Sequence, residues 1–232
     1  MYEDLYTGDG YAEMNPSWHV EESAWKAERI LHMLGRKGIA PKTICEVGCG
    51  AGEVLKQLQD RMDGACAFVG YDISPRAIAL CQTRANAQLQ FRLADIRQEP
   101  DAHYDLLLVL DVVEHVEDYF GLLRGLRPKA THTIFHLPLD VSVQTVLRPH
   151  GLLKTRAAYG HIHYFTKEIA LQLVRDAGYS VLDHIYTRRS LEMPTNELPK
   201  RLMRMPRKLL FALDEDVAAR VLGGFSLLIL AQ

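Results

Sequence analysis

The residues of this chain that are best suited to chemistry begin with a glycine-rich turn. Gly48, Gly50 and Gly52 lie in the segment EVGCGAG, after an apolar run that predicts a strand and before a stripe that predicts a helix. Because glycine has no side chain, it adopts positive φ angles and lets a ligand approach the backbone closely. The turn indicates either a nucleotide-type ligand or a plain strand-to-helix connection.

Acidic residues accompany four successive predicted strands near their carboxyl ends: Glu46, Asp72, Asp95 and Asp111. Open α/β sheets bind their ligands at that edge. Asp72, 20 residues beyond Gly52, can accept hydrogen bonds from both hydroxyls of a ribose, because a carboxylate offers two oxygens side by side. The alternative interpretation is a turn aspartate that caps the next helix.

The charge around the turn favours one kind of ligand over another. Glu53 occupies the position where a dinucleotide-binding turn carries its third glycine. A carboxylate in the first helical turn repels a pyrophosphate, and Glu46 adds a second negative charge. The turn is therefore better suited to a ligand with a cationic centre or an amine.

The elements that must position these residues alternate along the chain. Helices are expected at 20–35 and 114–127 and after Thr166. Expected strands are 43–48, 65–72, 89–95, 105–111, 132–138, 179–187 and 225–231. Strands that are apolar on both faces and alternate with helices predict a doubly wound, mostly parallel α/β sheet with helices on both sides. No parallel unit is left to build after Pro138, so the final two strands are expected to form an antiparallel pair.

Four segments occur in an order that resembles a known family. EVGCGAG (46–52), YDIS (71–74), ADI (94–96) and DVVEHVED (111–118) resemble the sequential motifs of class I S-adenosylmethionine-dependent methyltransferases. The segment 160–181 also resembles the small-molecule branch of that family. The resemblance covers residues 40–190. It implies a seven-stranded Rossmann-like sheet with a reversed last strand, and S-adenosylmethionine as the cofactor.

The resemblance also implies which residues bind each part of the cofactor. The methionine part would be held by Glu46, Gly48, Gly50 and Gly52. Ribose and adenine would be held by Asp72, Ile73, Asp95 and Ile96, in which Asp95 accepts a hydrogen bond from the adenine amine. The mouth of the pocket near the sulfonium would be lined by Asp111 and Val112.

Three histidines are candidates for the base that takes a proton from the acceptor: His115, His161 and His163. A hydroxyl, phenol or amine acceptor needs such a base, whereas a carboxylate does not. His115 could instead pack over the cofactor. His161 and His163 would share one face if their segment is a strand, and His161 could be a buried structural residue. Two such ligands are too few for a metal site, so no metal is predicted.

The chain is expected to form a single methyltransferase domain over 1–232. An N-terminal arm and helix (1–36) precede a cofactor-binding half (40–138), and two segments, 139–165 and 190–220, form a lid over the acceptor. His19 and Trp18 could close over the cofactor from the arm. The basic segment 200–208 could hold an anionic or carrier-linked acceptor, although a solvated helix face is the simpler interpretation.

The composition and net charge disfavour some classes of binding partner. Among 232 residues, 27 Lys and Arg oppose 29 Asp and Glu, a net charge of −2, which speaks against nucleic acid or an anionic membrane as partner. The N-terminus shows no secretory signal. The four cysteines do not have the spacing of a metal site and are predicted to be buried free thiols: Cys45, Cys49, Cys66 and Cys81. A cytoplasmic protein is expected, and its oligomeric state is left open.

The function that these features predict is methyl transfer from S-adenosylmethionine to a small-molecule acceptor by in-line displacement. One alternative is a nicotinamide-dependent oxidoreductase on the same fold, which Glu53 disfavours. Another is a non-catalytic subunit that keeps the cofactor pocket, which the complete glycine motif disfavours. The sequence leaves open whether oxygen, nitrogen or carbon is methylated.

Overall fold

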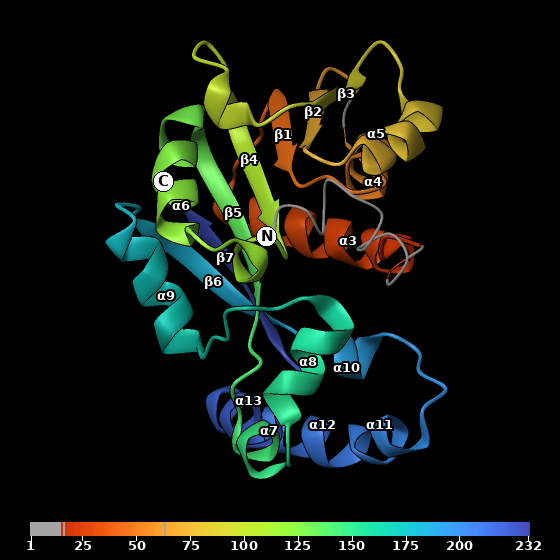
Figure 1. Ribbon diagram of the computed structural model, residues 1–232, viewed down its shortest axis with the longest axis vertical. Helices are drawn as coiled ribbons and strands as arrows, with labels where there is room; N and C mark the ends of the chain where they lie inside the picture. The colour runs from red at the N-terminus through yellow and green to blue at the C-terminus, as the bar shows by residue number, and fades with distance from the viewer. Residues whose placement is uncertain (1–14, 16, 63) are drawn as a thin grey trace.

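The computed structural model describes Asn15, residues 17–62 and residues 64–232 (Figure 1). Most of the predicted N-terminal arm, with Tyr2, Tyr6, Tyr11 and Pro16, lies outside the described residues. Trp18 and His19 are described, and both have positive φ angles, 48° and 55°.

Seven strands form one sheet in the order β3-β2-β1-β4-β5-β7-β6. Their bounds are β1 Thr43–Val47, β2 Ala67–Asp72, β3 Leu89–Leu93, β4 Tyr104–Leu110, β5 Ala130–Pro138, β6 Val181–Thr187 and β7 Ser226–Ala231. Strands β1 to β5 pair in parallel, and β7 lies antiparallel between β5 and β6. The predicted doubly wound sheet with a reversed last strand is confirmed, as is the antiparallel pair at the end of the chain.

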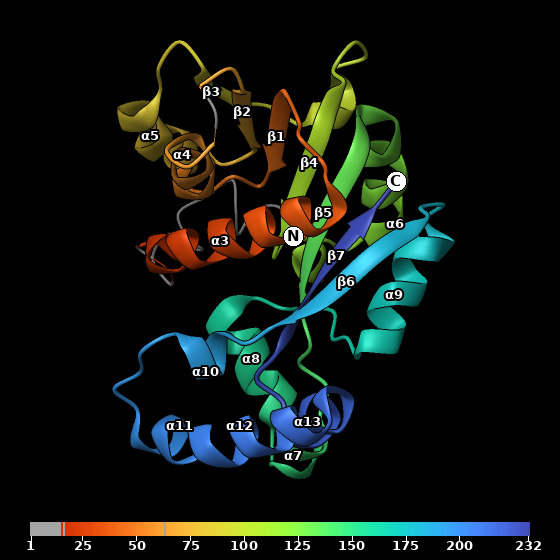
Figure 2. The same cartoon turned by 180° about the vertical axis from the view of Figure 1, so that it is seen from behind.

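Helices cover both faces of the sheet (Figures 1 and 2). One face packs against α3 (Val20–Lys37) and α4 (Glu53–Gln59), and the other packs against α6 (Tyr119–Leu126) and α9 (Lys167–Asp176). Because β4 is covered on both sides, its residues 106–109 are completely buried. Such two-sided burial explains why the central strands are uninterrupted apolar runs.

Side-chain caps fix where several helices begin. The hydroxyl of Ser74 accepts a hydrogen bond from the amide of Ala77 at the start of α5 (Pro75–Cys81), and Thr166 caps α9 in the same way. The predicted helix over 114–127 is wrong in its first turn. Residues 113–115 form a short 3-10 turn, and α6 begins only at Tyr119, because the Asp118 side chain caps that point.

A group of helices lies beyond the carboxyl ends of the parallel strands, in the lower part of Figure 1. They are α7 Val143–Leu147, α8 Gly151–Tyr159, α10 Arg189–Glu192, α11 Leu198–Leu202, α12 Arg204–Leu213 and α13 Glu215–Leu222. Phe211 of α12 stacks on Phe225 with ring centroids 5.1 Å apart, which gives this group an apolar centre of its own. The predicted lid segments fold into these helices, and their role as a lid stays a prediction.

The four cysteines are free and buried, as predicted. One of them supports the glycine-rich turn, because the Cys81 thiol lies 3.0 Å from the carbonyl oxygen of Gly50. No helix among the described residues is long and apolar enough to cross a membrane.

Replacement of Leu107 by alanine tests the two-sided burial of β4. Leu107 is fully buried in the central strand, so Leu107→Ala leaves a cavity and should lower the free energy of unfolding by about 2–5 kcal/mol. Urea denaturation measures the change. Leu147→Ala, at a side chain that is 77% exposed, is the matched control and should change stability by less than about 0.5 kcal/mol. Equal effects of the two substitutions would contradict this packing.

Candidate functional site

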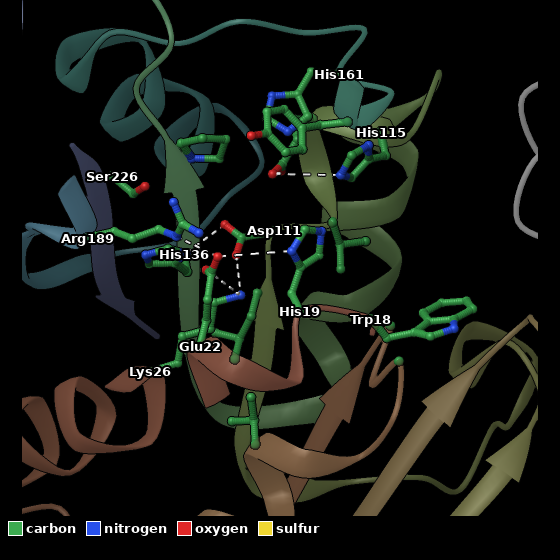
Figure 3. Close-up of a pocket in the computed structure, with 18 of the residues that line it drawn as sticks. Trp18, His19, Glu22, Lys26, Asp111, His115, His136, His161, Arg189 and Ser226 are labelled. Carbon is green, nitrogen blue, oxygen red and sulfur yellow. Dashed lines mark hydrogen bonds and ion pairs between the residues drawn. The ribbon is translucent and has the colours of Figure 1, made fainter. Parts of the chain in front are cut away.

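A cavity of about 950 Å³ opens at the carboxyl ends of the parallel strands (Figure 3). Residues that follow β1, β2, β4 and β5 line its floor, α3 contributes Glu22 and Lys26, and α8 and α10 close the far side. Of the sequence-predicted site residues, His163 and Gly52 are absent from the lining. Every predicted acid, namely Glu46, Asp72, Asp95 and Asp111, reaches it.

The glycine-rich turn holds the conformation that its sequence predicts. Gly48, Gly50 and Gly52 have φ angles of 68°, 53° and 75°. A Cβ atom on Gly48 would lie 2.7 Å from the side chain of Val112, and one on Gly52 would lie 2.5 Å from the ring of Phe91. The turn therefore requires glycine for both backbone conformation and space. Gly52 acts at the back of the turn rather than in the cavity.

Asp72 braces the same turn from β2. Its buried carboxylate accepts hydrogen bonds from the amide of Gly50 at 2.9 Å and from the amide of Ser74 at 2.8 Å. Burial raises the pKa of Asp72, and these backbone donors oppose that rise. Each carboxylate oxygen has a second lone pair, so the group can still accept from a ribose. Ile73 beside it is 42% exposed and lines the cavity, where an aromatic base could pack.

Asp95 follows β3 and lies at the cavity edge, but its carboxylate is already engaged. The Arg97 guanidinium Nε lies 3.0 and 2.9 Å from its two oxygens, and the Arg97 amide donates to it as well. An adenine amine would have to share this acceptor with Arg97. Ile96 is almost fully buried, and it lines the cavity from the core side.

Glu46 is a buried carboxyl group whose charge has little compensation. Its Oε2 atom has no hydrogen-bond partner among the residues that the structure describes. Burial raises the pKa of Glu46 to about 8, against the charge of Lys26, and Asp72 and Asp111 raise it further. A cationic group in the cavity would restore the ionised form. The chain thus fits the ammonium and sulfonium groups of S-adenosylmethionine at this place.

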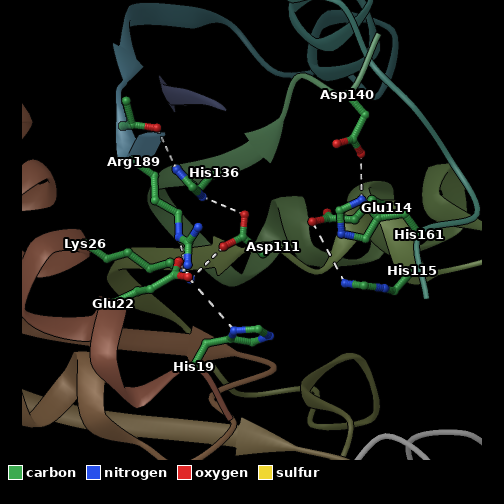
Figure 4. Close-up of polar contacts among 11 residues, drawn as sticks. His19, Glu22, Lys26, Asp111, Glu114, His115, His136, Asp140, His161 and Arg189 are labelled. Carbon is green, nitrogen blue, oxygen red and sulfur yellow. Dashed lines mark hydrogen bonds and ion pairs between the residues drawn. The ribbon is translucent and has the colours of Figure 1, made fainter. Parts of the chain in front are cut away.

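Asp111 holds the centre of a buried network (Figure 4). Its φ angle is 53°, a left-handed conformation that residues other than glycine rarely adopt. The carboxylate lies 2.7 Å from Lys26 Nζ and 2.6 Å from His136 Nδ1, and His136 Nε2 lies 2.8 Å from Thr187 Oγ1. Burial alone would raise the pKa of Asp111, but His136 and Lys26 hold it well below its usual value.

The partners of Asp111 in this network were not among the predicted site residues. His136 lies within β5, which ends at Pro138, and its side chain lines the cavity. Glu22 lies 3.9 Å from Lys26 Nζ and accepts a hydrogen bond from Arg189 of α10. The spacing of Glu22 and Lys26, four residues apart on one helix, is the signal that could have found this pair. No sequence pattern indicates Arg189, because it lies in α10, which is 167 residues from Glu22 along the chain.

The acceptor side of the cavity holds two of the predicted histidines. His115 Nδ1 lies 3.2 Å from the carbonyl oxygen of Gly160, and His161 Nδ1 lies 2.6 Å from Asp140 Oδ2. The two rings meet edge to face with centroids 5.0 Å apart. Burial, with a contribution from His161, lowers the pKa of His115 to about 4, so its ring is neutral at pH 7.

His161 and His163 would share one face only in a strand, and that condition is not met. Their segment forms no strand, and backbone amides of 162 and 163 donate instead to the carbonyl of Glu114. His163 Nε2 lies 3.0 Å from the carbonyl oxygen of Val116, and its ring packs edge to face on Tyr119. His163 thus belongs to the packing behind the cavity.

Two acids on the acceptor side, Asp140 and Glu114, were not among the predicted site residues. Asp140 follows β5, so the rule that selected the acids after four strands could have found it. Glu114 is fully buried, and both of its carboxylate oxygens lack a hydrogen-bond partner within the described part of the chain. Burial and the nearby charge of Asp111 raise the pKa of Glu114 well above its usual value.

The basic segment 200–208 does not act as one anion-binding cluster. Of its described side chains only Arg207 lines the cavity, where it donates to Gln144 Oε1 and to the carbonyl of Leu222. Arg204 donates to backbone carbonyls of 191 and 193. Arg201 and Lys208 are exposed. The expected anionic or carrier-linked acceptor gains no support from this segment as a whole.

The sheet order and the acid-lined cavity at its carboxyl edge define the class I S-adenosylmethionine-dependent methyltransferase fold. The sequence matches the methyltransferase domain family over residues 18–184, and the chain belongs to this family. The matched residues include the glycine-rich turn, the four acids, His115 and His161.

Relatives and solved structures agree with this assignment. A ubiquinone biosynthesis O-methyltransferase of Pseudomonas savastanoi pv. phaseolicola (strain 1448A / Race 6) is 26% identical over 118 residues, which cover 47% of this chain and 50% of the relative. The chain thus matches about half the length of the curated relatives.

Two solved structures share the fold across almost the whole chain. Magnesium protoporphyrin IX methyltransferase from Synechocystis PCC 6803 with bound S-adenosylhomocysteine (SAH) has a TM-score of 0.63 at 18% identity, covering 98% of this chain and 96% of that one. N-methyltransferase NodS from Bradyrhizobium japonicum WM9, also with SAH, has a TM-score of 0.58 at 16% identity, covering 99% and 95%. Proteins of this fold therefore hold the cofactor product.

Replacement of Glu46 by glutamine tests the uncompensated carboxyl group. Its pKa rises from 4.5 to about 8 on folding, so between these pH values the folded protein holds one proton more than the unfolded chain. Wild-type stability should therefore fall with rising pH by about 1.4 kcal/mol per pH unit from this group. Glu46→Gln removes that slope, and its stability relative to wild type should increase from pH 4.5 to pH 8 in urea denaturation.

The control is Glu53→Gln on the neighbouring helix. Hydrogen bonds from Gln57 and Arg84 outweigh its partial burial and lower the pKa of Glu53, so its contribution to stability is present above the ordinary pKa and is lost as pH falls. This variant should be less stable than wild type at pH 8. A Glu46→Gln variant that is also less stable at pH 8 would refute the uncompensated state of Glu46.

Proposed function

We propose that this protein transfers a methyl group from S-adenosylmethionine to a hydroxyl group of a small-molecule acceptor. The observation that carries the proposal is the arrangement of the cavity: acids that suit a cationic cofactor lie on one side, and His161, held by Asp140, lies on the other. The curated relative named above is an O-methyltransferase, which supports oxygen as the acceptor atom.

The cofactor half of the cavity has separate tasks for its residues. Asp72 accepts from the ribose hydroxyls while it holds the glycine-rich turn, and Glu46 faces the ammonium group. Asp111 is kept ionised by Lys26 and His136, so a fixed negative charge lies near the sulfonium. The cofactor supplies an electrophilic methyl group, and the protein has to align the acceptor and manage its proton.

The acceptor half can position and deprotonate a hydroxyl. The carboxylate of Asp140 accepts from His161 Nδ1, which leaves Nε2 of a neutral ring with its lone pair. The neutral His115 ring lies directly beside it. An acceptor that needs no proton removal would make no use of this pair, which favours a hydroxyl over a carboxylate acceptor.

Membership of the methyltransferase family disfavours a nicotinamide-dependent reaction, and Glu53 points the same way. A non-catalytic cofactor-binding subunit would keep the turn and Asp72 but has no need for the Asp140–His161 pair. An assay of SAH release across phenols, alcohols and amines separates these functions. Release with hydroxyl acceptors supports the proposal, and release with amines alone overturns its choice of acceptor.

Substitution of Asp72 should weaken cofactor binding. Asp72→Ala removes the ribose acceptor and the brace on Gly50, and each charge-assisted hydrogen bond contributes roughly 1.5–3 kcal/mol. The dissociation constant of S-adenosylmethionine, measured by calorimetry, should rise at least tenfold. Asp101→Ala, at an exposed acid away from the cavity lining, should bind as wild type does. Unchanged affinity in Asp72→Ala would remove Asp72 from the cofactor site.

Substitution of His161 should separate turnover from cofactor binding. His161→Ala should lower kcat by roughly 10²–10⁴-fold with SAH affinity unchanged, because the ring acts on the acceptor. His163→Ala is the matched control two residues away, outside the cavity lining, and should keep cofactor affinity and most of its turnover. If His161→Ala turns over at the wild-type rate, the Asp140–His161 pair does not take the proton from the acceptor.

A further inference from the structure

The least explained feature of the cavity is Glu114. Its carboxyl group is fully buried and lines the cavity, and neither oxygen has a hydrogen-bond partner among residues 15, 17–62 and 64–232. An unpaired buried carboxyl group is costly, because burial removes its hydration without replacing it. Neither cofactor binding nor the Asp140–His161 pair uses this group. A ligand that supplies positive charge would complete it.

Two imidazoles converge on this carboxyl group (Figure 4). His115 Nε2 lies 4.0 Å from Glu114 Oε1, and the ligating atoms of Glu114, His115 and His161 all lie within 4.8 Å of one another. Four-coordinate zinc keeps its ligand atoms about 3.3 Å apart, so these side chains would have to approach by about 1.5 Å at most.

The hydrogen bonds behind the two histidines fix the ring atoms that face the carboxyl group. A carbonyl oxygen accepts only, so the 3.2 Å contact with Gly160 places the proton of the neutral His115 ring on Nδ1. The carboxylate of Asp140 does the same for His161 at 2.6 Å. Both rings then offer Nε2 as the basic atom. Metal-bound histidines have this arrangement, in which the other nitrogen donates to a carbonyl or a carboxylate.

We propose that Glu114, His115 and His161 bind a divalent first-row transition metal ion, such as zinc, on the acceptor side of the cavity. Two imidazoles and one carboxylate are a known ligand set for catalytic zinc that keeps a position open for substrate. Magnesium and calcium prefer oxygen ligands throughout and are disfavoured. The prediction of no metal counted His161 with His163; the structure replaces His163 by His115 and adds Glu114.

The role of the ion rests on the proposed function. In the metal-bound protein His161 Nε2 is a ligand, so the ion takes the place of the free His161 ring in activating the acceptor. Coordination would lower the pKa of an acceptor hydroxyl, whose proton leaves to bulk solvent. The oxygen then forms a bond to the methyl carbon while the carbon–sulfur bond breaks and its electron pair goes to sulfur. The products are a methyl ether and neutral SAH, and the metal changes no oxidation state.

Metal binding can be tested without any acceptor. Purified full-length protein, stripped with chelator and reloaded, should hold one zinc per chain by elemental analysis and show the visible absorption of coordinated Co²⁺. Glu114→Gln and His161→Asn should each weaken zinc binding at least a hundredfold, and Asp140→Asn by 10–100-fold. His163→Asn is the matched control and should bind zinc as wild type does. SAH binding by every variant checks that the fold is intact.

The outcomes separate this site from the proposed function. Wild-type protein that takes up neither zinc nor Co²⁺, or variants that bind zinc as tightly as wild type, would overturn the metal site. Stripped protein that binds SAH but turns over only after zinc is returned supports the catalytic role, and undiminished turnover without metal refutes it. Failure to release SAH in metal-loaded protein would count against the proposed function and leave the metal site standing.

Discussion

The ion pair between Asp111 and Lys26 is the interaction on which the rest of the site depends. It places a carboxylate at the end of the central strand β4 and joins it to α3 at 2.7 Å. Both side chains are largely removed from solvent, so breaking the pair from one side leaves a poorly compensated charge. His136 secures the other oxygen of the same group from β5. Three elements thus meet at one carboxylate, and the cavity is built around it.

The positions of the acids could be predicted from the sequence because a parallel sheet brings the carboxyl ends of its strands to one edge. Glu46, Asp72, Asp95 and Asp111 each follow an apolar run, and all four reach the cavity. The glycine-rich turn could also be predicted from the sequence, because its positive φ angles require glycine. These features depend on local pattern and on one rule of topology.

Other parts of the site depend on contacts that no local pattern records. The choice between His115 and His163 as the partner of His161 is decided by the path of residues 160–165. This segment forms no strand, and its amides at 162 and 163 bond to the carbonyl of Glu114. Arg189 joins Glu22 only because α10 folds back over α3. The first turn expected at 114 was displaced because the Asp118 side chain caps α6 further along. Periodicity shows which residues face inward, but not what they meet there.

The pairs that join α3 to α10 also set the order in which this protein can assemble. Trp25 donates to Glu192 and Arg189 donates to Glu22, and each pair spans 167 residues of chain. Contacts of such long sequence separation carry a higher loop-closure cost than local ones, so we expect them to form after the local contacts of the first half. During synthesis, the first half can build its strands and its glycine turn while the wall of the cavity is still missing. The cavity is therefore complete only after α10 has been synthesised and has packed against α3.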